Sequence, residues 1–403
     1  MAEKRDVQRF LIGGRVYAAD DDALQQALAT VHDAGDRPRC LCRSAGVEMY
    51  VALHRWYVVK RMPDSGSQHH PRCPSYAPEP GQSGLGELVG EAVLETQPGQ
   101  VELRVDFPWT HLAAGGAARK SADRAPSPEV QAPRRRMSLR AVTHFLFERA
   151  GLNRWVPAMA GKRRQSVIHK YLMDAAVDVS VKGEDLAQRL YVPEAFDRAT
   201  YADTVHRRRE KLALLHGAQD RLPLALLLGE LKTTDARGAS VRVWIKHMPD
   251  VPLWVDARVW ARLERANAAL FEASVADVGA RPRLLLCALI RARREHTYEI
   301  DAACVMLTSE QWIPVEGVHE LPLIDALVRQ QRRFFKPLRY DARASEFPAV
   351  LLLDTGASAT PLYVASEFAP EREQAAARRA ASAAGSWLWA TRTPMPKFPP
   401  AVP

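Results

Sequence analysis

The pattern of apolar and polar positions divides the 403-residue chain into β-rich and helical stretches. Near the start, residues 8–18 show two strand patterns around a Gly-Gly turn, and residues 47–62 show two β-branched and aromatic runs typical of a hairpin. From Ser138 onwards, apolar side chains recur at helical spacing, and helical patterns continue to residue 217. Strand patterns then return at 222–232, 239–247, 281–292 and 297–307, with a helical pattern over 255–273.

The last part of the chain combines helical and strand patterns. They are a helix at 319–335, strands at 349–353 and 361–365, a helix at 371–384 and a strand at 386–390. Residues 113–136 are poor in hydrophobic side chains, which is typical of a disordered linker. We therefore predict an α+β (mixed α/β) fold. Its segments are a zinc-stapled, β-rich N-terminal module (1–112), the linker (113–136), a helical region (137–220) and a C-terminal mixed-sheet domain (221–403).

Composition narrows the class of protein. Apolar residues make up 47% and charged residues 26% of the chain, so a chain of this length can form a core without disulfides. The net charge of +9 favours an acidic partner, of which nucleic acid is the commonest. No signal-peptide pattern and no apolar run of about 18 residues occurs, so we expect a cytoplasmic protein without a membrane partner.

Three of the five cysteines cluster with two histidines, as Cys40-x-Cys42 and His69-His70-x-x-Cys73. In a cytoplasmic protein this pattern favours a metal over a disulfide. Structural zinc takes four such ligands at tetrahedral positions, usually two from each of two tight turns. The hairpin between the two motifs brings them together, and the spacing permits either histidine as the fourth ligand. A closed set of four ligands predicts a structural zinc ion.

Several blocks of the sequence resemble one uncharacterised bacterial family. They include RCLCRSAGVEMYVALHRWYVVKRMPDSGSQHHPRCPSY, SLRAVTHFLFERAGLNRW, LLLGELK, IKHMPD, RRFFKPLRYD and WLWATRTPMP. On these blocks the chain is identified as a member of the family called DUF1173, over nearly its whole length. Such proteins are commonly found with conjugative elements or plasmids. The resemblance therefore implies a role in mobile-DNA biology and supplies no mechanism.

The final unit, 347–390, resembles the β-β-α-β part of the PD-(D/E)xK nuclease core. Active members carry carboxylates that hold a divalent metal ion and a lysine that orients water. Here Ala349 stands at the place of the aspartate and Tyr363-Val364-Ala365 at the place of Glu-x-Lys, so we expect a degenerate, inactive unit. A second nuclease-like set is Asp220, Glu230 and Lys232. The alternative for that set is a buried strand that runs into a polar turn.

Basic clusters suggest where nucleic acid could bind. The segment RRFFKPLRY interleaves aromatic side chains with four cations: Arg332, Arg333, Lys336 and Arg339. Cations for phosphates with aromatic faces for bases are typical of single-strand binding surfaces. The alternative is that the aromatic residues pack inward above a solvated basic face. A second candidate surface consists of Lys162, Arg163 and Arg164.

Together these features predict a non-catalytic, zinc-containing nucleic-acid-binding accessory protein of a mobile genetic element, with DNA favoured over RNA. Two alternatives stay open. One is a metal-dependent PD-(D/E)xK-type nuclease that uses Asp220, Glu230 and Lys232. The other is a protein–protein adaptor that binds partner proteins of a conjugation or defence complex.

Overall fold

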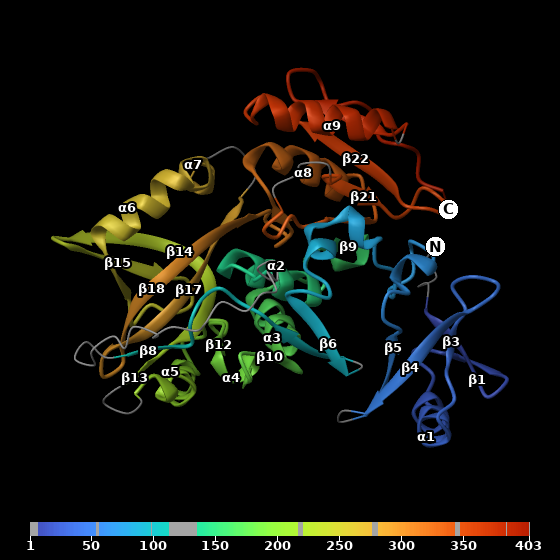
Figure 1. Cartoon of the computed structure of the whole chain (residues 1–403), viewed down its shortest axis with the longest axis horizontal. Helices are drawn as coiled ribbons and strands as arrows, with labels where there is room; N and C mark the ends of the chain where they lie inside the picture. Colours follow the sequence, from blue (N-terminus) through green and yellow to red (C-terminus); the bar gives the residue numbers. More distant parts are fainter. Residues whose placement is uncertain are drawn as a thin grey trace, which may run out of the picture.

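The computed structural model describes residues 7–402 except for 54–55, 98, 113–134, 217–220, 276–280, 343–346 and 384. The predicted linker thus lies outside the described residues except for Arg135 and Arg136. The described chain mixes helices with several sheets, which confirms the α+β class (Figure 1). The N-terminal module lies at one end of the molecule, and a β-barrel lies at the other.

The N-terminal module is a five-stranded antiparallel sheet with one helix. Its strands are β1 (Arg9–Ile12), β2 (Arg15–Ala18), β3 (Arg39–Cys40), β4 (Val47–Leu53) and β5 (Tyr57–Arg61), in the order β2-β1-β3-β4-β5. Helix α1 (Leu24–Ala34) buries Leu24, Leu28 and Val31 against Phe10 and Ile12 of the sheet. The predicted Gly-Gly turn joins β1 to β2, with φ of 54° at Gly13 and 77° at Gly14, a conformation that favours glycine.

The middle of the chain packs helices on a small sheet. The helices are α2 (Leu139–Arg149), α3 (Gln165–Ala176), α4 (Leu186–Arg189) and α5 (Tyr201–Lys211). The sheet has the order β11-β10-β7-β6, formed by β6 (Val93–Gln97), β7 (Gln100–Leu103), β10 (Val179–Val181) and β11 (Glu184–Asp185). Ser138 caps α2, because its hydroxyl oxygen accepts a hydrogen bond from the Ala141 N–H at 3.2 Å.

The barrel consists of five strands whose hydrogen-bonded ladder closes on itself. They are β14 (Ala225–Arg237), β15 (Ser240–Ile245), β16 (Leu253–Asp256), β17 (Arg283–Arg294) and β18 (Thr297–Thr308). Their order is β14-β15-β16-β18-β17, and β17 pairs with β14 again. The first half of β14 pairs with β17 and its second half with β15. Helices α6 (Ala257–Ala266) and α7 (Ala268–Val275) lie between β16 and β17 in the chain.

Alternation along the barrel strands separates its inside from its outside. Val241, Val243 and Ile245 of β15 are buried in the barrel core, whereas Arg242 and Trp244 between them are only partly buried. This is the period of two that a strand requires when one face packs on the core.

Short strands and 3-10 helices complete the described chain. They are β8 (Thr110–Leu112), β9 (Arg154–Trp155), β12 (Leu190–Tyr191), β13 (Arg221–Pro223), β19 (Pro314–Val315), η1 (Gly66–Gln68), η2 (Pro80–Gln82), η3 (Gly84–Glu87), η4 (Pro157–Met159), η5 (Ala213–Leu215) and η6 (Val318–Glu320).

The C-terminal unit is a second mixed sheet, in the order β23-β22-β21-β20-β9. Its elements are α8 (Leu321–Arg329), β20 (Phe334–Phe335), β21 (Val350–Leu352), β22 (Thr360–Ala365), α9 (Glu371–Ala383) and β23 (Trp387–Ala390). The predicted helix 319–335 is wrong in its second half. It ends at Arg329, Gln331 turns the chain with φ 55°, and Phe334 and Phe335 join a sheet between Leu352 and Trp155 instead. The predicted β-β-α-β order is present, while its likeness to a nuclease stays a prediction.

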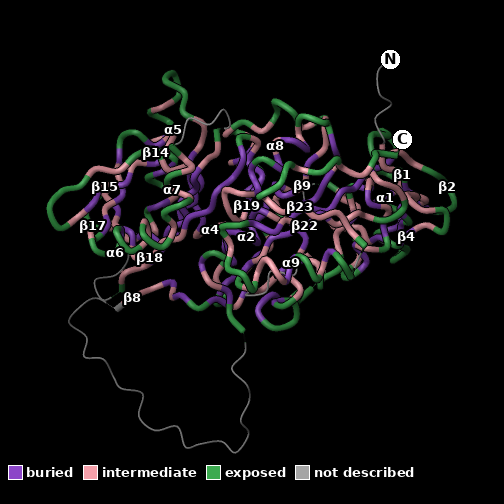
Figure 2. Tube along the Cα trace, turned by 90° about the horizontal axis from the view of Figure 1, so that it is seen from above, coloured by how far each residue is buried: buried purple, intermediate pink, exposed green. Residues whose placement is uncertain are grey.

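The parts of the chain share their hydrophobic cores. One cluster joins residues of α2, α3, β7 and β10 to one face of β14 and β17, and another fills the barrel and reaches β21, β22 and β23. Figure 2 shows buried residues along the centre of the trace and exposed ones at its turns. None of the helices in the described ranges is both long and apolar enough to cross a membrane.

Candidate metal centre

The first pair of cysteines lies where β3 turns into β4. Cys40 is the last residue of β3 and pairs with Phe10 of β1 on one side and Val47 of β4 on the other. Cys42 lies in the following turn, which closes through a hydrogen bond from the Gly46 N–H to the Arg43 carbonyl at 3.0 Å. The sheet thus fixes the backbone of the first ligand, and the turn fixes the second.

The second arm follows the β4–β5 hairpin. Helix η1 ends at Gln68, and the backbone of His69 is extended. A tight turn then brings back Cys73, whose N–H donates to the His70 carbonyl at 2.8 Å. Two turns therefore contribute ligands from positions about 30 residues apart, as the sequence pattern predicted.

The structure brings together Cys40, Cys42, His69 and Cys73, whose ligand atoms all lie within 4.8 Å of one another. The Cys40 and Cys73 sulfurs are 3.7 Å apart, and His69 Nδ1 lies 3.3 Å from the Cys42 sulfur and 3.7 Å from the Cys73 sulfur. Tetrahedral zinc with ordinary bond lengths needs about 3.8 Å between two sulfurs and about 3.6 Å between sulfur and nitrogen. The group can hold a metal ion, and its chemistry and spacing are compatible with zinc.

Disulfide chemistry does not explain the cluster. All three cysteines are free, and the Cys40–Cys73 separation far exceeds the roughly 2 Å of a disulfide. The Cys73 thiol lowers the pKa of Cys40 to about 3 through their hydrogen bond, and the same bond raises the pKa of Cys73. Burial raises the pKa of Cys42. A cation among the three sulfurs would stabilise all of them as thiolates.

Hydrogen-bond donors surround the sulfurs. Gln8 Nε2 donates to the Cys40 sulfur at 3.3 Å and to the Cys73 sulfur at 3.6 Å. Backbone N–H groups of His70 and Ser75 donate to Cys42 and Cys73, at 3.5 and 3.4 Å. Such donors stabilise thiolates and orient metal ligands from the second shell. Gln8 carried no sequence signal, because it lies 32 residues before the first cysteine of the motif.

The two histidines of the motif have different positions. His69 is fully buried in the cluster, and its Nε2 has no hydrogen-bond partner among the described residues. His70 is not part of the cluster; its Nδ1 accepts a hydrogen bond from the Arg72 N–H at 3.2 Å. Of the two spacings that the sequence left open, the structure therefore favours the one with His69.

Two arginines attach the second arm to the rest of the molecule. Arg154 of β9 donates hydrogen bonds to the carbonyls of Pro71, Cys73, Pro74 and Tyr76, at distances from 2.6 to 3.3 Å. Burial lowers the pKa of Arg154 to about 10, well above neutrality. Arg43 donates to the carbonyls of Gln68 and His69 and, 314 residues further on, to that of Ala357. Sequence reasoning missed both arginines, although Arg43 follows a ligand directly.

The basic segment RRFFKPLRY is mostly buried. Arg332 is 6% exposed and pairs with Asp354 through two hydrogen bonds of 2.9 and 2.7 Å. Lys336 is 1% exposed and lies 3.2 Å from a Glu320 carboxylate oxygen. These two residues, which the sequence predicted as phosphate contacts, therefore pair with carboxylates inside the protein. They are buried because they flank β20, whose residues are buried within the sheet. Arg333 is partly exposed.

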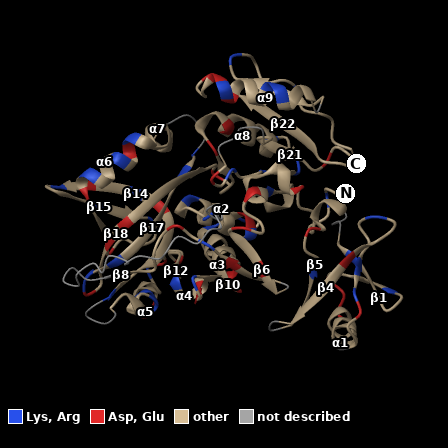
Figure 3. Ribbon diagram, viewed as in Figure 1, with Lys and Arg blue, Asp and Glu red and all other residues tan. Residues whose placement is uncertain are grey.

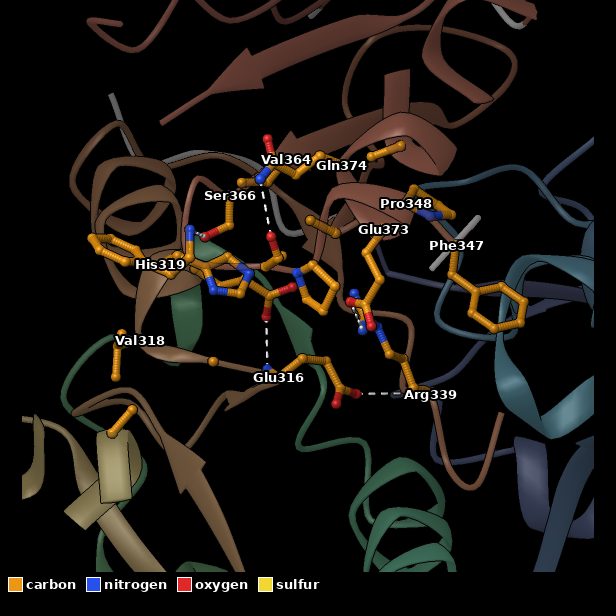
Figure 4. A pocket seen from close by; sticks show the side chains of 18 of the residues that line it. Glu316, Val318, His319, Arg339, Phe347, Pro348, Val364, Ser366, Glu373 and Gln374 are labelled. Atoms are coloured by element: carbon orange, nitrogen blue, oxygen red, sulfur yellow. Dashed lines mark hydrogen bonds and ion pairs between the residues drawn. The ribbon is translucent and has the colours of Figure 1, made fainter. Parts of the chain in front are cut away.

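The fourth residue of that segment, Arg339, lines a cavity of about 280 Å³ between α7, η6 and α9 (Figure 4). It lies 3.5 Å from Glu373, and its backbone N–H donates to Glu316 at 2.9 Å. Burial alone would raise the pKa of Glu316, yet the surrounding basic groups, His144 first, lower it to about 2. The arginine is thus held in an internal network of charges.

In the second candidate basic surface, Arg163 is only partly exposed. Arg163 donates to the carbonyls of Leu152 and Gln311 at 2.8 and 3.1 Å, and its guanidinium lies over the Trp155 ring at 5.3 Å. Its role in the structure is therefore to connect backbone segments. Lys162 and Arg164 are exposed and remain available to an acidic partner.

The alternative nuclease set is not assembled in the described residues. Asp220 lies outside them. The Glu230 carboxylate is neutralised by Lys246 and Arg283, each 2.9 Å away, and Lys232 is exposed at the β-bulge between Leu231 and Thr233. Within the described ranges, the residues that could hold a metal ion are those of the Cys/His cluster.

The fold and the site together define an α+β protein whose β-rich N-terminal module carries a Cys₃His group able to hold a metal ion. The chain belongs to the DUF1173 family, described as proteins of unknown function, whose family model matches residues 10–392. No curated protein and no solved structure matches the chain.

Proposed function

We propose that this chain is a non-catalytic, zinc-containing nucleic-acid-binding accessory protein of a mobile genetic element, and that it acts in the cytoplasm. The zinc ion would be held by Cys40, Cys42, His69 and Cys73. Four protein ligands complete a tetrahedron and leave no position for a substrate, so zinc would stabilise the fold and take no part in chemistry. The context of mobile DNA comes from the resemblance to the DUF1173 family alone.

The connectivity of the barrel is the observation that carries the nucleic-acid part of the proposal. Its long first strand, β14, pairs with both the second and the fourth strand, a helical segment separates the third from the fourth, and the third and fifth run parallel. This is the strand order of the OB fold, a small barrel that binds oligonucleotides or oligosaccharides on strands two and three and the adjoining loops. A net charge of +9 favours the nucleotide ligand.

Basic residues lie beside the barrel as well as elsewhere in the molecule. Lys and Arg residues occur on α6, beside the barrel, and on α9, rather than in one compact patch (Figure 3). Phosphate contacts need cations that are not already paired with carboxylates of the protein, and exposed, unpaired arginines meet that condition. Burial removes Arg332 and Lys336 from this role, so the binding surface is sought on the barrel.

The test is binding of fluorescent single- and double-stranded DNA by the full chain, measured by anisotropy at several salt concentrations with and without manganese. The same samples are then run on a denaturing gel. We expect affinity to fall steeply with salt, because each phosphate contact releases a counterion, and we expect the DNA to stay intact. Cleaved DNA would replace the proposal by the nuclease alternative. No binding even at low salt would leave the protein–protein adaptor as the better hypothesis.

A further inference from the structure

A continuous row of side chains crosses the outer face of the barrel. Asp235 on β14 pairs with Arg242 on β15, and Arg242 pairs with Trp254 on β16. Trp254 is in turn the partner of Glu299 on β18, which pairs with Arg291 on β17. Direct cross-strand partners point to the same face of a sheet, about 5 Å apart. Five neighbouring strands thus align charged and aromatic groups on the solvent side.

The two tryptophans of this face lie outside the hydrophobic cores. Trp244 and Trp254 are each partly exposed, and neither belongs to the hydrophobic clusters of the described residues. The Arg293 guanidinium lies over the Trp254 ring, 4.3 Å from its centre, and that of Arg242 lies 6.0 Å from the centre of the Trp244 ring. Large aromatic rings normally contribute to a core, so rings kept at the surface beside arginines suggest a ligand with flat, electron-rich groups.

The free positive charge on this face comes from the C-terminal end of β17. Arg293 and Arg294 are exposed, and none of the described carboxylates pairs with either of them. The other arginines are partly neutralised, since Arg242 and Arg237 contact Asp235, and Arg291 lies 3.0 Å from Glu299. An anionic chain would therefore meet its unpaired cations beside Trp254.

We propose that this face, formed by Trp244, Trp254, Arg242 and Arg293, binds single-stranded nucleic acid. The inference rests on the proposed function and adds to it the ligand class and the site. Bases stack on the tryptophans, and phosphates contact Arg293 and Arg294. In a duplex the base faces are already stacked on one another, so a surface that offers aromatic faces selects unpaired strands. DNA and RNA strands share this chemistry.

The experiment compares the full-length protein with Trp254→Ala and Trp244→Ala variants in binding to labelled oligo-dT, oligo-rU and a duplex of equal length. Loss of one stacking ring should weaken single-strand binding about fivefold to a hundredfold and leave duplex binding unchanged. Trp254→Phe, which keeps an aromatic face, should restore most of the affinity. Arg293→Ala should also reduce the dependence of log affinity on log salt by about 0.7, the value for one single-strand phosphate contact.

Two substitutions elsewhere serve as controls. Trp56→Ala removes an indole that is 63% exposed on the N-terminal module, and Arg379→Ala removes an exposed cation on α9. Neither should change single-strand binding, and circular dichroism should show all variants folded. The oligo-dT and oligo-rU arms separate DNA from RNA as the strand that is preferred.

Salt-dependent binding by the wild type that is unaffected by the Trp244, Trp254 and Arg293 variants would overturn this site while the proposed function stands. Equal loss for duplex and single strand would overturn the selection for unpaired bases. No binding by the wild type at low salt would overturn both the site and the proposed function. If Trp254→Ala unfolds the barrel, Trp244→Ala and Arg293→Ala still decide the question, because both leave the Trp254 ring in place and both should weaken single-strand binding.

Discussion

The ion pair between Arg332 and Asp354 provides the sharpest test of how the basic segment is used. The two side chains are 7% and 8% exposed and share two hydrogen bonds, and Arg332 Nη1 also donates to the Pro399 carbonyl at 2.8 Å. Arg332→Ala would leave a buried carboxylate whose one remaining donor among the described residues is the Arg333 N–H, 2.9 Å away. Breaking a buried pair from one side typically costs about 3–5 kcal/mol. We therefore expect a large loss of stability.

Urea unfolding monitored by tryptophan fluorescence measures that loss. With a denaturant dependence of about 2 kcal/mol per molar urea, the midpoint of the transition that includes the C-terminal sheet should fall by roughly 2 M. Arg333→Ala is the matched control, because the Arg333 side chain, next to Arg332 in the chain, is partly exposed. This substitution should change the free energy of unfolding by less than about 0.5 kcal/mol. The double variant Arg332→Met, Asp354→Leu should recover most of the loss, since it leaves no unpaired charge.

The opposite result would refute this reasoning. If Arg332→Ala unfolds at the wild-type urea concentration and binds DNA with a reduced salt dependence, the guanidinium contacts phosphate in solution. The sequence-based assignment of this arginine to a nucleic-acid surface would then be right.

Three further predictions concern the metal site and one buried acid. Elemental analysis should find one zinc per chain, lost in Cys73→Ser and kept in His70→Ala; loss in His70→Ala would contradict the choice of His69. Arg154→Ala should retain zinc but speed hydrogen exchange of the Arg72, Cys73, Ser75 and Tyr76 amides about tenfold or more, because four carbonyls of this turn lose a charged donor; unchanged exchange would mean that the turn is stable without Arg154. Burial raises the pKa of Glu148 to about 7, above the roughly 4.3 of an unfolded glutamate, so the folded state binds the extra proton between these values. Its contribution is fully present below about pH 4 and is lost as pH rises to 7. Glu148→Gln should therefore match the wild type near pH 4 and exceed its stability by roughly 3–4 kcal/mol at pH 8, and equal curves at both pH values would refute the shift.

Local patterns predicted much of the secondary structure and the metal ligands. The Gly-Gly turn, the capped start of α2 at Ser138 and the strands around residues 222–232 and 239–247 follow from periodicity and turn chemistry within a few residues. The spacing of the Cys and His residues likewise predicted the group of metal ligands, because the ligands lie on two tight turns joined by one hairpin.

Contacts between distant residues could not be predicted in the same way. Arg332 looked like a surface cation because its partner Asp354 lies 22 positions away, just after β21, and the helical pattern of 319–335 hid the change to β20. Closure of the barrel depends on pairing between Glu230 and Leu285, which no periodicity reports. Arg154 and Gln8 donate hydrogen bonds to the second ligand arm and to the cysteine sulfurs, and both lie outside the Cys/His motif. Such assignments require the fold, because burial and pairing of a charge are properties of the tertiary structure.

Arg154 and Arg43 hold the second ligand arm through its backbone carbonyls, and these contacts affect the order in which the parts of the chain can fold during synthesis. The two ligand arms are complete once about residue 73 has left the ribosome, but β9 belongs to a sheet whose other strands extend to Ala390, and Arg43 reaches Ala357. The module that carries the Cys/His cluster can therefore form early, yet its final attachment has to wait until almost the whole chain has been translated. Prematurely terminated chains should contain a folded N-terminal module that moves independently of the rest.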